Sequence, residues 1–335
     1  MASQPPRVCV TGAGGFVASW LVKLLLSRGY SVHATVRDPN DPKNAFLKQL
    51  DGASENLKLF QADVLEYDTL TSAFAGCQGV FHPATPVIGD KLVDPEKEIM
   101  APTVKGTRNV LEACSATNIQ KLVVVSSAAA ACLDPNWPED RLKDETCWSD
   151  KQMCKEIESW YCLAKTEAEE MALEHGQENG LHLVTLLPGH VVGPLLQTAV
   201  ISTSIKAFQY IIKGGPDTMN NKFWPLVHVH DVADALLLVY ENAEPYQRYI
   251  CALEQMDIKD MVVLLRSMFP SYDYVDKTVD VDYKLNFTAD KLKKLGWKPR
   301  GLEETLADGL QFLEKAGLLR EPCRLPYIYR MNAEE

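Results

Sequence analysis

The sequence has no long hydrophobic run, no surplus of basic charge and no regular arrangement of cysteines. No segment reaches the roughly 18 uncharged apolar residues of a membrane-spanning helix, and the N-terminal stretch lacks the apolar core of a secretory signal. The formal net charge of −11 disfavours nonspecific binding to nucleic acid or anionic membranes, which requires a lysine and arginine surplus. We therefore expect a cytoplasmic protein with no nucleic-acid or membrane partner.

The nine cysteines form neither a disulfide framework nor a zinc motif. Their number is odd, they are spread over the chain and none stands in a CxxC pair, so we expect reduced thiols and no bound metal. Cys147, Cys154 and Cys162 fall within sixteen residues. This spacing leaves a redox pair, such as Cys147 with Cys154, as the alternative.

Repeats and low-complexity tracts are absent as well, and the composition is that of a folded globular protein. The 335 residues are 46% hydrophobic and 24% charged, which suffices for one large α/β domain with an added lobe. In the first half, apolar runs alternate with amphipathic stretches, a pattern typical of βαβ units. We predict strands at 7–11, 31–36, 57–61, 79–82, 121–126 and 181–187, and helices at 16–28, 43–50, 66–75, 96–117 and 150–175.

This pattern predicts a doubly wound parallel α/β sheet, a Rossmann domain, with a smaller C-terminal α/β substrate lobe. The alternation ends near residue 190, and turns, a helix at 231–241 and short helices with loops follow. We expect residues 1–190 to bind a nucleotide and to contain the catalytic residues. Residues 191–321 should form the substrate lobe, with the chain crossing between the lobes, and residues 322–335 a tail extended over the surface.

A glycine-rich turn, TGAGGFVA, follows the first predicted strand. Gly12 allows the tight turn, Gly15 lets the backbone approach a pyrophosphate, and Ala18 lets the helix pack closely on the strand. The free amides at the helix N-terminus favour a negatively charged ligand. We therefore predict that a dinucleotide contacts this segment through Gly12, Gly14, Gly15, Phe16 and Val17.

The end of the second predicted strand favours NADP(H) over NAD(H). An acidic residue at this place binds a ribose 2′-hydroxyl, whereas an arginine binds a 2′-phosphate. Arg37 can hold a phosphate through its bidentate guanidinium, and Lys43 adds a second cation. Asp38 leaves NAD(H) as the alternative, although it precedes a proline and can instead cap the turn.

Tyr161 and Lys165 lie four residues apart, on one face of the helix predicted at 150–175. A free phenol has a pKa of about 10, and a nearby ammonium favours the phenolate and lowers that pKa. Ser127, after the fifth predicted strand, can donate a hydrogen bond to a carbonyl oxygen that gains negative charge. Asn109 can complete a proton relay. A core tyrosine with a solvated lysine is the alternative for this spacing alone, but the order of glycine turn, serine and tyrosine favours a catalytic centre.

Together these segments resemble the extended short-chain dehydrogenase/reductase superfamily, and within it the plant cinnamoyl-CoA reductase and cinnamoyl-CoA-reductase-like group. The resemblance covers most of the chain and rests on VTGAGGFVASWLVKLLLSRGY, TVRDPNDPKN, GVFHPATPV, DETCWSD, WYCLAKTEAE, GPLLQ and LVHVHDVADALLLVYE. It implies NADPH as cofactor and a centre of Ser127, Tyr161 and Lys165. It also implies reduction of hydroxycinnamoyl-CoA thioesters to aldehydes, a phenylpropanoid reaction of lignin biosynthesis.

By position, the resemblance implies further contacts with the cofactor. It places Arg37 and Lys43 at the 2′-phosphate. The remaining positions are Asp63 and Val64 near the adenine, Ala84, Thr85 and Pro86 after the fourth strand, and the segment from Pro188 to Val191 beside the nicotinamide.

The segment around Tyr161 departs from the family pattern. Cinnamoyl-CoA reductases carry KNWYCYGK, whereas this chain has ESWYCLAK, and Ile201 replaces a polar pocket residue. Two alternatives therefore stay open: reduction of a phenolic or other small aldehyde or ketone, and a nucleotide-binding sensor with little turnover. His190 either faces the nicotinamide pocket or is packed, and Trp224 is expected in the core or in a lid.

Overall fold

The computed structural model describes residues 5–86, 89–197, 199–253, 255–281 and 285–329. Within these ranges the central element is a seven-stranded sheet in the order β10-β6-β5-β4-β1-β2-β3. Its strands are β1 (Arg7–Val10), β2 (Ser31–Val36), β3 (Leu57–Gln61), β4 (Gly79–His82), β5 (Lys121–Val125), β6 (His182–Pro188) and β10 (Gln247–Cys251). Neighbouring strands pair in parallel throughout, with Val8 of β1 opposite Val32 of β2. The predicted doubly wound α/β fold is confirmed.

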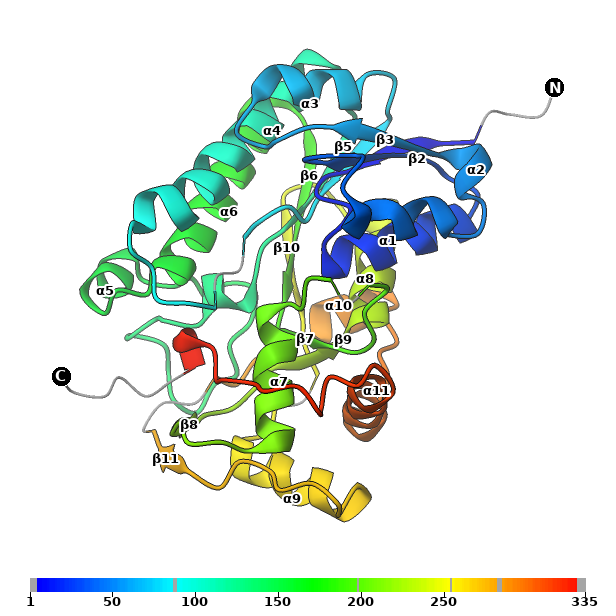
Figure 1. Cartoon of the computed structure of the whole chain (residues 1–335). Coiled ribbons are helices and arrows are strands. Elements are labelled where there is room, and N and C mark those ends of the chain that lie inside the picture. Colours follow the sequence, from blue (N-terminus) through cyan, green and yellow to red (C-terminus); the bar gives the residue numbers. More distant parts are fainter. Residues whose placement is uncertain (1–4, 87–88, 198, 254, 282–284, 330–335) are drawn as a thin grey trace.

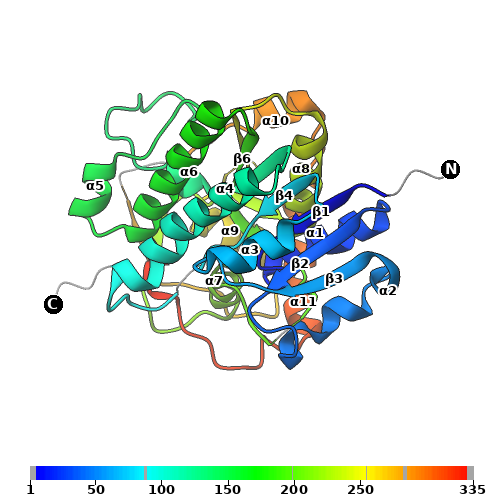
Figure 2. The same cartoon turned by 90° about the horizontal axis from the view of Figure 1, so that it is seen from above.

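Helices cover both faces of this sheet, so the inner strands are buried on both faces and are apolar. The covering helices are α1 (Phe16–Ser27), α3 (Tyr67–Phe74), α4 (Gly106–Ala116), α6 (Trp160–Asn179) and α8 (Val229–Asn242). Figures 1 and 2 show α3, α4 and α6 on one face, and α1 and α8 on the other. Successive residues of a strand point to opposite faces of the sheet. Val8 and Val10 pack with α1, whereas Cys9 packs with α3 and α4.

Shorter helical segments connect these elements. The predicted helix at 43–50 is a 3₁₀ segment, η1 (Pro42–Gln49), and the helix predicted at 96–117 begins as a π-helical segment, η2 (Glu96–Lys105), before α4. Pro102 lies within η2, where its missing N–H interrupts the regular hydrogen-bond ladder. The other short segments are α2 (Ala53–Asn56), η3 (Ala128–Ala131), α5 (Lys151–Glu156), α10 (Asp290–Leu295) and η4 (Tyr327–Tyr329).

A second lobe follows the carboxyl end of β6 and occupies the lower part of Figure 1. Its elements are α7 (Thr203–Lys213), α9 (Ile258–Met268), α11 (Leu302–Lys315), β7 (His190–Val192), β8 (Met219–Asn221), β9 (Leu226–His228) and β11 (Thr278–Asp280). β7 pairs with β9, and β8 pairs with β11. Between these elements, α8 and β10 return to the central sheet, so the chain crosses between the lobes and the sheet extends beyond the boundary at residue 190.

The helix predicted at 150–175 is interrupted, and this part of the prediction is wrong. α5 ends at Glu156, Glu158 has a φ of 52°, and α6 begins at Trp160. A positive φ is unusual for a residue with a side chain, and here it turns the chain before the helix starts again. Tyr161 therefore lies in the first turn of α6, with Lys165 one turn further along.

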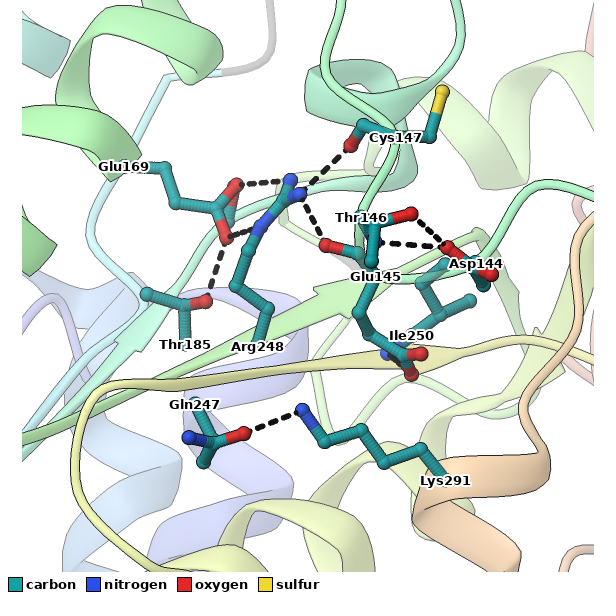
Figure 3. A network of polar contacts seen from close by, with 11 residues as sticks. Asp144, Glu145, Thr146, Cys147, Glu169, Thr185, Gln247, Arg248, Ile250 and Lys291 are labelled. Carbon is teal, nitrogen blue, oxygen red and sulfur yellow. Dashed lines mark hydrogen bonds and ion pairs between the residues drawn. The ribbon is translucent and has the colours of Figure 1, made fainter. Parts of the chain in front are cut away.

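A buried ion pair joins α6 to the sheet (Figure 3). Glu169 of α6 accepts hydrogen bonds from Ser126 after β5 at 2.7 Å and from Thr185 of β6 at 2.6 Å. Arg248 of β10 pairs with the same carboxylate, with Nε at 2.8 Å from Oε1. The side chains of Arg248 and Glu169 are only 6% and 0% exposed. One carboxylate thus connects α6 to three strands.

The guanidinium of Arg248 also holds the segment that precedes α5. Its Nη1 donates to the carbonyl oxygens of Glu145 and Cys147, both at 2.7 Å. The Trp148 ring covers it, with the guanidinium carbon 3.5 Å from the ring centroid. A buried ion pair is tolerated when its polar atoms are hydrogen-bonded in this way.

Removing one member of this pair leaves a buried charge without its counter-charge. We expect Arg248→Met to lower the free energy of unfolding by about 3–5 kcal/mol, measured by urea denaturation with circular dichroism. The matched control is Lys259→Met, because Lys259 and Asp280 form an ion pair with side chains 50% and 73% exposed. For this variant we expect a loss below about 1 kcal/mol. Equal losses for the two variants would contradict the structural role of the buried pair.

Candidate active site

The glycine turn connects β1 to α1 and is bound to β2. Gly12 has a φ of 61°, and its N–H donates to Thr35 Oγ1 at 3.0 Å. A Cβ atom at Gly12 would lie 3.0 Å from the Cβ of Ala84, in the segment after β4. The turn therefore requires glycine at this position for its backbone conformation and for its packing.

The N-terminus of α1 can receive an anion. Gly15 is the N-cap, no side chain caps the helix, and its first turn, which begins with Phe16 and Val17, holds no acidic residue. The amides of such a turn and the helix dipole favour a phosphate. Gly14 lies against the Asn44 side-chain oxygen, where a Cβ atom would collide. These residues fit the pyrophosphate of a dinucleotide.

Two exposed cations lie beside the end of β2. Arg37 directly follows the strand, and Lys43 pairs with Asp41, Nζ to Oδ2 at 2.7 Å. Both lower the pKa of Asp41, Lys43 by hydrogen bonding and Arg37 through its charge. Asp38 caps the turn, because its Oδ1 accepts the N–H of Asn40 at 2.8 Å. Arg37 and Lys43, two cations that can bind a phosphate, therefore lie close together. The Asp38 carboxylate is already hydrogen-bonded to the backbone.

Asn109 of α4 is bound to the segment after β3. Its Nδ2 donates to the carbonyl oxygen of Val64, which follows Asp63, at 2.8 Å. The side-chain amide of Asn109 makes no other hydrogen bond within the described part of the chain. The structure thus brings Asn109 to the predicted adenine side and gives it no direct contact with Tyr161 or Lys165.

Tyr161 and Ser127 are neighbours at the carboxyl edge of the sheet. Burial raises the pKa of Tyr161 to about 12, and a hydrogen bond donated by the Ser127 hydroxyl acts in the opposite direction. Ser127 is itself held as the N-cap of η3, accepting the N–H of Ala129 at 3.2 Å. A protonated phenol and a serine hydroxyl therefore lie close to one another.

The ammonium of Lys165 contacts the sheet. Its Nζ donates to Thr85 Oγ1 at 3.0 Å and to the Val125 carbonyl oxygen at 2.9 Å. Burial lowers the pKa of Lys165 to about 8, although the Glu169 carboxylate one turn further along α6 raises it. The sequence predicted that this ammonium lowers the pKa of Tyr161. In the structure that pKa is raised instead, because burial of the phenol is the largest effect.

A small polar cavity lies behind Lys165, and sequence reasoning missed it. The Thr103 hydroxyl is buried there and has no hydrogen-bond partner in the described ranges. A polar cavity of this kind can hold a water molecule. No motif marks Thr103 within its helical segment. The polar residues around the cavity are His82, Thr85, Thr103, Thr107, Ser126, Lys165 and Glu169.

The segment from Pro188 to Val191 leads from β6 into β7 and carries a packed histidine. His190 stacks on Trp224 with ring centroids 4.3 Å apart. Burial lowers the pKa of His190 to about 3, so the imidazole is neutral at physiological pH. Trp224 is fully buried. Of the two alternatives for each residue, the structure shows His190 packed and Trp224 in the core.

The C-terminal segment joins the same aromatic cluster, so the predicted surface tail is wrong for Leu325, Pro326 and Tyr329, which are buried, whereas Tyr327 and Ile328 are exposed. Tyr329 of η4 is 8% exposed, and its ring centroid lies 5.0 Å from that of Trp224 and 5.5 Å from that of His190. Burial, and to a smaller extent the Tyr161 phenol, raise the pKa of Tyr329. Figure 1 shows this segment in red, running past α7. Residues 330–335 lie outside the described residues.

The thiols that lie close together near this site are not Cys147 and Cys154, the pair considered from the sequence. Cys132 Sγ lies 3.7 Å from Cys162 Sγ, whereas Cys147 and Cys154 are buried, and all nine cysteines are free. Across the described ranges, no group of three or more histidine, cysteine or acidic side chains is placed to hold a metal ion. Nor does any helix in the described part of the chain have the length and apolar character that a membrane crossing requires.

Known proteins match most of the chain. The model of the NAD dependent epimerase/dehydratase family matches residues 8–252. The sequence is 43% identical to cinnamoyl-CoA reductase 1 of Petunia hybrida over 323 residues, 95% of each chain. The crystal structure of vestitone reductase from alfalfa (Medicago sativa) matches with a TM-score of 0.79 at 31% identity, covering 93% of this chain and 99% of that one. Yeast methylglyoxal/isovaleraldehyde reductase Gre2 complexed with NADPH matches with a TM-score of 0.79 at 25% identity and the same coverage.

The buried ammonium of Lys165 makes stability depend on pH. Its pKa is lowered to about 8 in the folded protein and is about 10.4 in an unfolded chain. Between these values the unfolded chain binds the proton and the folded protein does not, so the stability contribution of Lys165 rises with pH. From about pH 7.5 to about pH 9.5, we expect the unfolding free energy of the wild type to increase by about 2 kcal/mol relative to Lys165→Met.

Urea denaturation of both proteins at the two pH values, with reductant present, measures this difference. Lys259→Met is the control, because the Lys259 side chain is half exposed, and it should show no such dependence on pH. A difference between wild type and Lys165→Met that stays constant with pH would contradict the lowered pKa of Lys165.

Proposed function

Since the chain belongs to the NAD dependent epimerase/dehydratase family and is an oxidoreductase of the short-chain dehydrogenase/reductase type, we propose that it reduces a hydroxycinnamoyl-CoA thioester to the aldehyde with NADPH. The observation that carries this proposal is the placement of Tyr161 near Ser127, one helical turn from Lys165. Lys165 in turn contacts Thr85, next to the Ala84 that packs on the glycine turn. The identity of 43% with a cinnamoyl-CoA reductase supports the substrate.

The proposed cofactor site follows the carboxyl edge of the sheet. Bound NADPH supplies a hydride from its nicotinamide. The glycine turn and the N-terminus of α1 would hold its pyrophosphate, and Arg37 and Lys43 its 2′-phosphate. The other proposed contacts are Asp63 and Val64 near the adenine, Ala84, Thr85 and Pro86 along the centre, and Pro188 and Val191 beside the nicotinamide.

The proposed catalytic residues activate and protonate the carbonyl oxygen. Ser127 donates a hydrogen bond to this oxygen, which gains negative charge as hydride reaches the carbonyl carbon. Tyr161 then transfers its phenolic proton to the oxygen, and its raised pKa keeps the phenol protonated until that step. Lys165 stabilises the phenolate that remains. With a thioester, the resulting hemithioacetal loses the CoA thiol and becomes the aldehyde.

After the reaction Tyr161 must regain a proton, and the polar cavity behind Lys165 offers a route for it. We propose that water in the polar cavity connects the Lys165 ammonium with the Thr103 hydroxyl, which has no partner in the described ranges. Asn109 then supports catalysis indirectly, because it positions Val64 through its hydrogen bond. We place the reaction in the cytoplasm, since nine free thiols fit a reducing compartment.

A small aldehyde or ketone is the second candidate substrate. The sequence around Tyr161 lacks the KNWYCYGK pattern, and Ile201 packs against the apolar core of the second lobe where a polar pocket residue is usual. The likeness to vestitone reductase and to methylglyoxal/isovaleraldehyde reductase also favours this candidate. The same residues would carry out the proton transfer.

Tyr161→Phe should lower kcat roughly 100-fold or more, because the proton donor is removed, while NADPH affinity stays the same. Loss of NADPH absorbance with feruloyl-CoA as substrate measures the rate. Tyr249→Phe is the control, since it removes a buried phenol on β10 instead. Unchanged turnover in Tyr161→Phe would refute the assigned role. Oxidation of NADPH by coniferaldehyde and not by feruloyl-CoA would replace the thioester with the second candidate.

Arg37→Ala should weaken NADPH binding by roughly 10-fold or more and leave NADH binding nearly unchanged, because only NADPH carries the 2′-phosphate. Fluorescence titration of the protein with each cofactor measures both dissociation constants. Lys48→Ala removes another exposed cation from η1 and is the control. Equal losses for NADPH and NADH would exclude Arg37 from the 2′-phosphate site.

A further inference from the structure

The ammonium of Lys222 has no hydrogen-bond or ion-pair partner among the described residues. Lys222 follows β8, and its Nζ lies 5.5 Å from the ring centroid of Tyr329. Burial lowers the pKa of Lys222, and the nearby thiols of Cys132 and Cys162 act in the opposite direction. The Lys222 side chain is partly exposed, and a partly desolvated cation without a counter-charge is less stable than a paired one.

Packing places Lys222 near the segment of Tyr161, because its neighbour Phe223 packs in one cluster with Cys132, whose Sγ lies 3.7 Å from that of Cys162. Cys162, the next residue along α6, and His190 both have their pKa lowered by the charge of Lys222. The Tyr329 ring below the ammonium is also close enough to Tyr161 for the two to interact electrostatically. Lys222 therefore lies in the neighbourhood of the segment that carries the proposed proton donor.

Two buried polar atoms belong to the aromatic cluster that contains Tyr329, and both have no partner in the described part of the chain. They are Trp224 Nε1 and His190 Nδ1. Their rings stack on each other, and both rings pack against Tyr329. Buried nitrogens without partners are rare in folded proteins, and each one calls for an explanation such as a ligand. Ammonium, indole N–H and one imidazole tautomer are all donors, so an oxygen acceptor suits all three.

We propose that Lys222, with Trp224 and His190, forms a subsite for an anionic oxygen of the substrate, a carboxylate or a phenolate on an aromatic ring. This oxygen is distinct from the reacting carbonyl oxygen, which Ser127 and Tyr161 bind. The inference rests on the proposed function, since it names the substrate class of that same site.

Binding in the absence of hydride transfer tests the subsite. Isothermal titration calorimetry of the complex with NADP⁺ compares 4-carboxycinnamaldehyde with 4-carbamoylcinnamaldehyde, which differ in charge at nearly equal size. We expect the wild type to bind the acid at least roughly 10-fold more tightly. Lys222→Met should remove this preference by weakening the acid alone. A second pair, 4-hydroxycinnamaldehyde and 4-methoxycinnamaldehyde, distinguishes a phenolate site from a carboxylate site.

Lys277→Met removes an exposed lysine of the same lobe and is the matched control, with the preference expected to stay unchanged. Lys222→Arg keeps the charge and should keep the preference, and Lys222→Gln replaces the methionine variant if circular dichroism shows that the latter is unfolded. Equal binding of both members of each pair by the wild type, or equal weakening of both members in the variants, would overturn the subsite. Slower alkylation of Cys162 by iodoacetamide in Lys222→Met, with no change in preference, would overturn it in favour of a thiolate partner.

The same compounds with NADPH separate this inference from the proposed function. If the preference is present in binding but no NADPH is oxidised with any aldehyde or with feruloyl-CoA, the reductase proposal fails and the anion subsite stands. If NADPH is oxidised equally well with acid and amide, and both bind equally, the reductase proposal stands and the subsite fails.

Discussion

The buried Glu169 carboxylate is the interaction on which the candidate active site depends. It lies two turns after Tyr161 and one turn after Lys165 on α6, and it binds Ser126, Thr185 and Arg248 from three strands of the sheet. Ser126 directly precedes Ser127. The same carboxylate therefore fixes the helix that carries the phenol and the strand end that carries the serine, which sets the distance between them.

This carboxylate also links the fold to the chemistry through charge. Lys165 lies in a buried environment that lowers its pKa, and the negative charge of Glu169 raises it again. Arg248 compensates Glu169 from the other side and is itself bound to two backbone carbonyls. The buried charges thus alternate from Arg248 through Glu169 to Lys165. Charges of alternating sign can be buried because each one is compensated by its neighbour. Lys222 has no such partner in the described ranges and is therefore suited to bind an anion supplied by a ligand.

The sequence predicts those features that depend on residues close together in the chain. The apolar strands, the glycine turn and the placement of Tyr161 and Lys165 on one helix all follow from residues close together in the chain. Features that depend on contacts between distant residues could not be predicted from the sequence. Arg248 meets Glu169 across 79 positions, and Tyr329 packs against His190 and Trp224 only because the C-terminal segment returns to them. The positive φ of Glu158, which divides the predicted helix, has no signal in the sequence because glycine or asparagine usually marks such a turn.

The most direct test of this account is the pH dependence of single-turnover hydride transfer from NADPH to feruloyl-CoA in wild type and Glu169→Gln. Without the carboxylate charge, Lys165 loses the interaction that raises its pKa, and α6 loses an ion pair to the sheet. We predict transfer roughly 10-fold or more slower at neutral pH and a profile shifted to lower pH, with the protein still folded. Superimposable profiles for the two proteins would contradict the account.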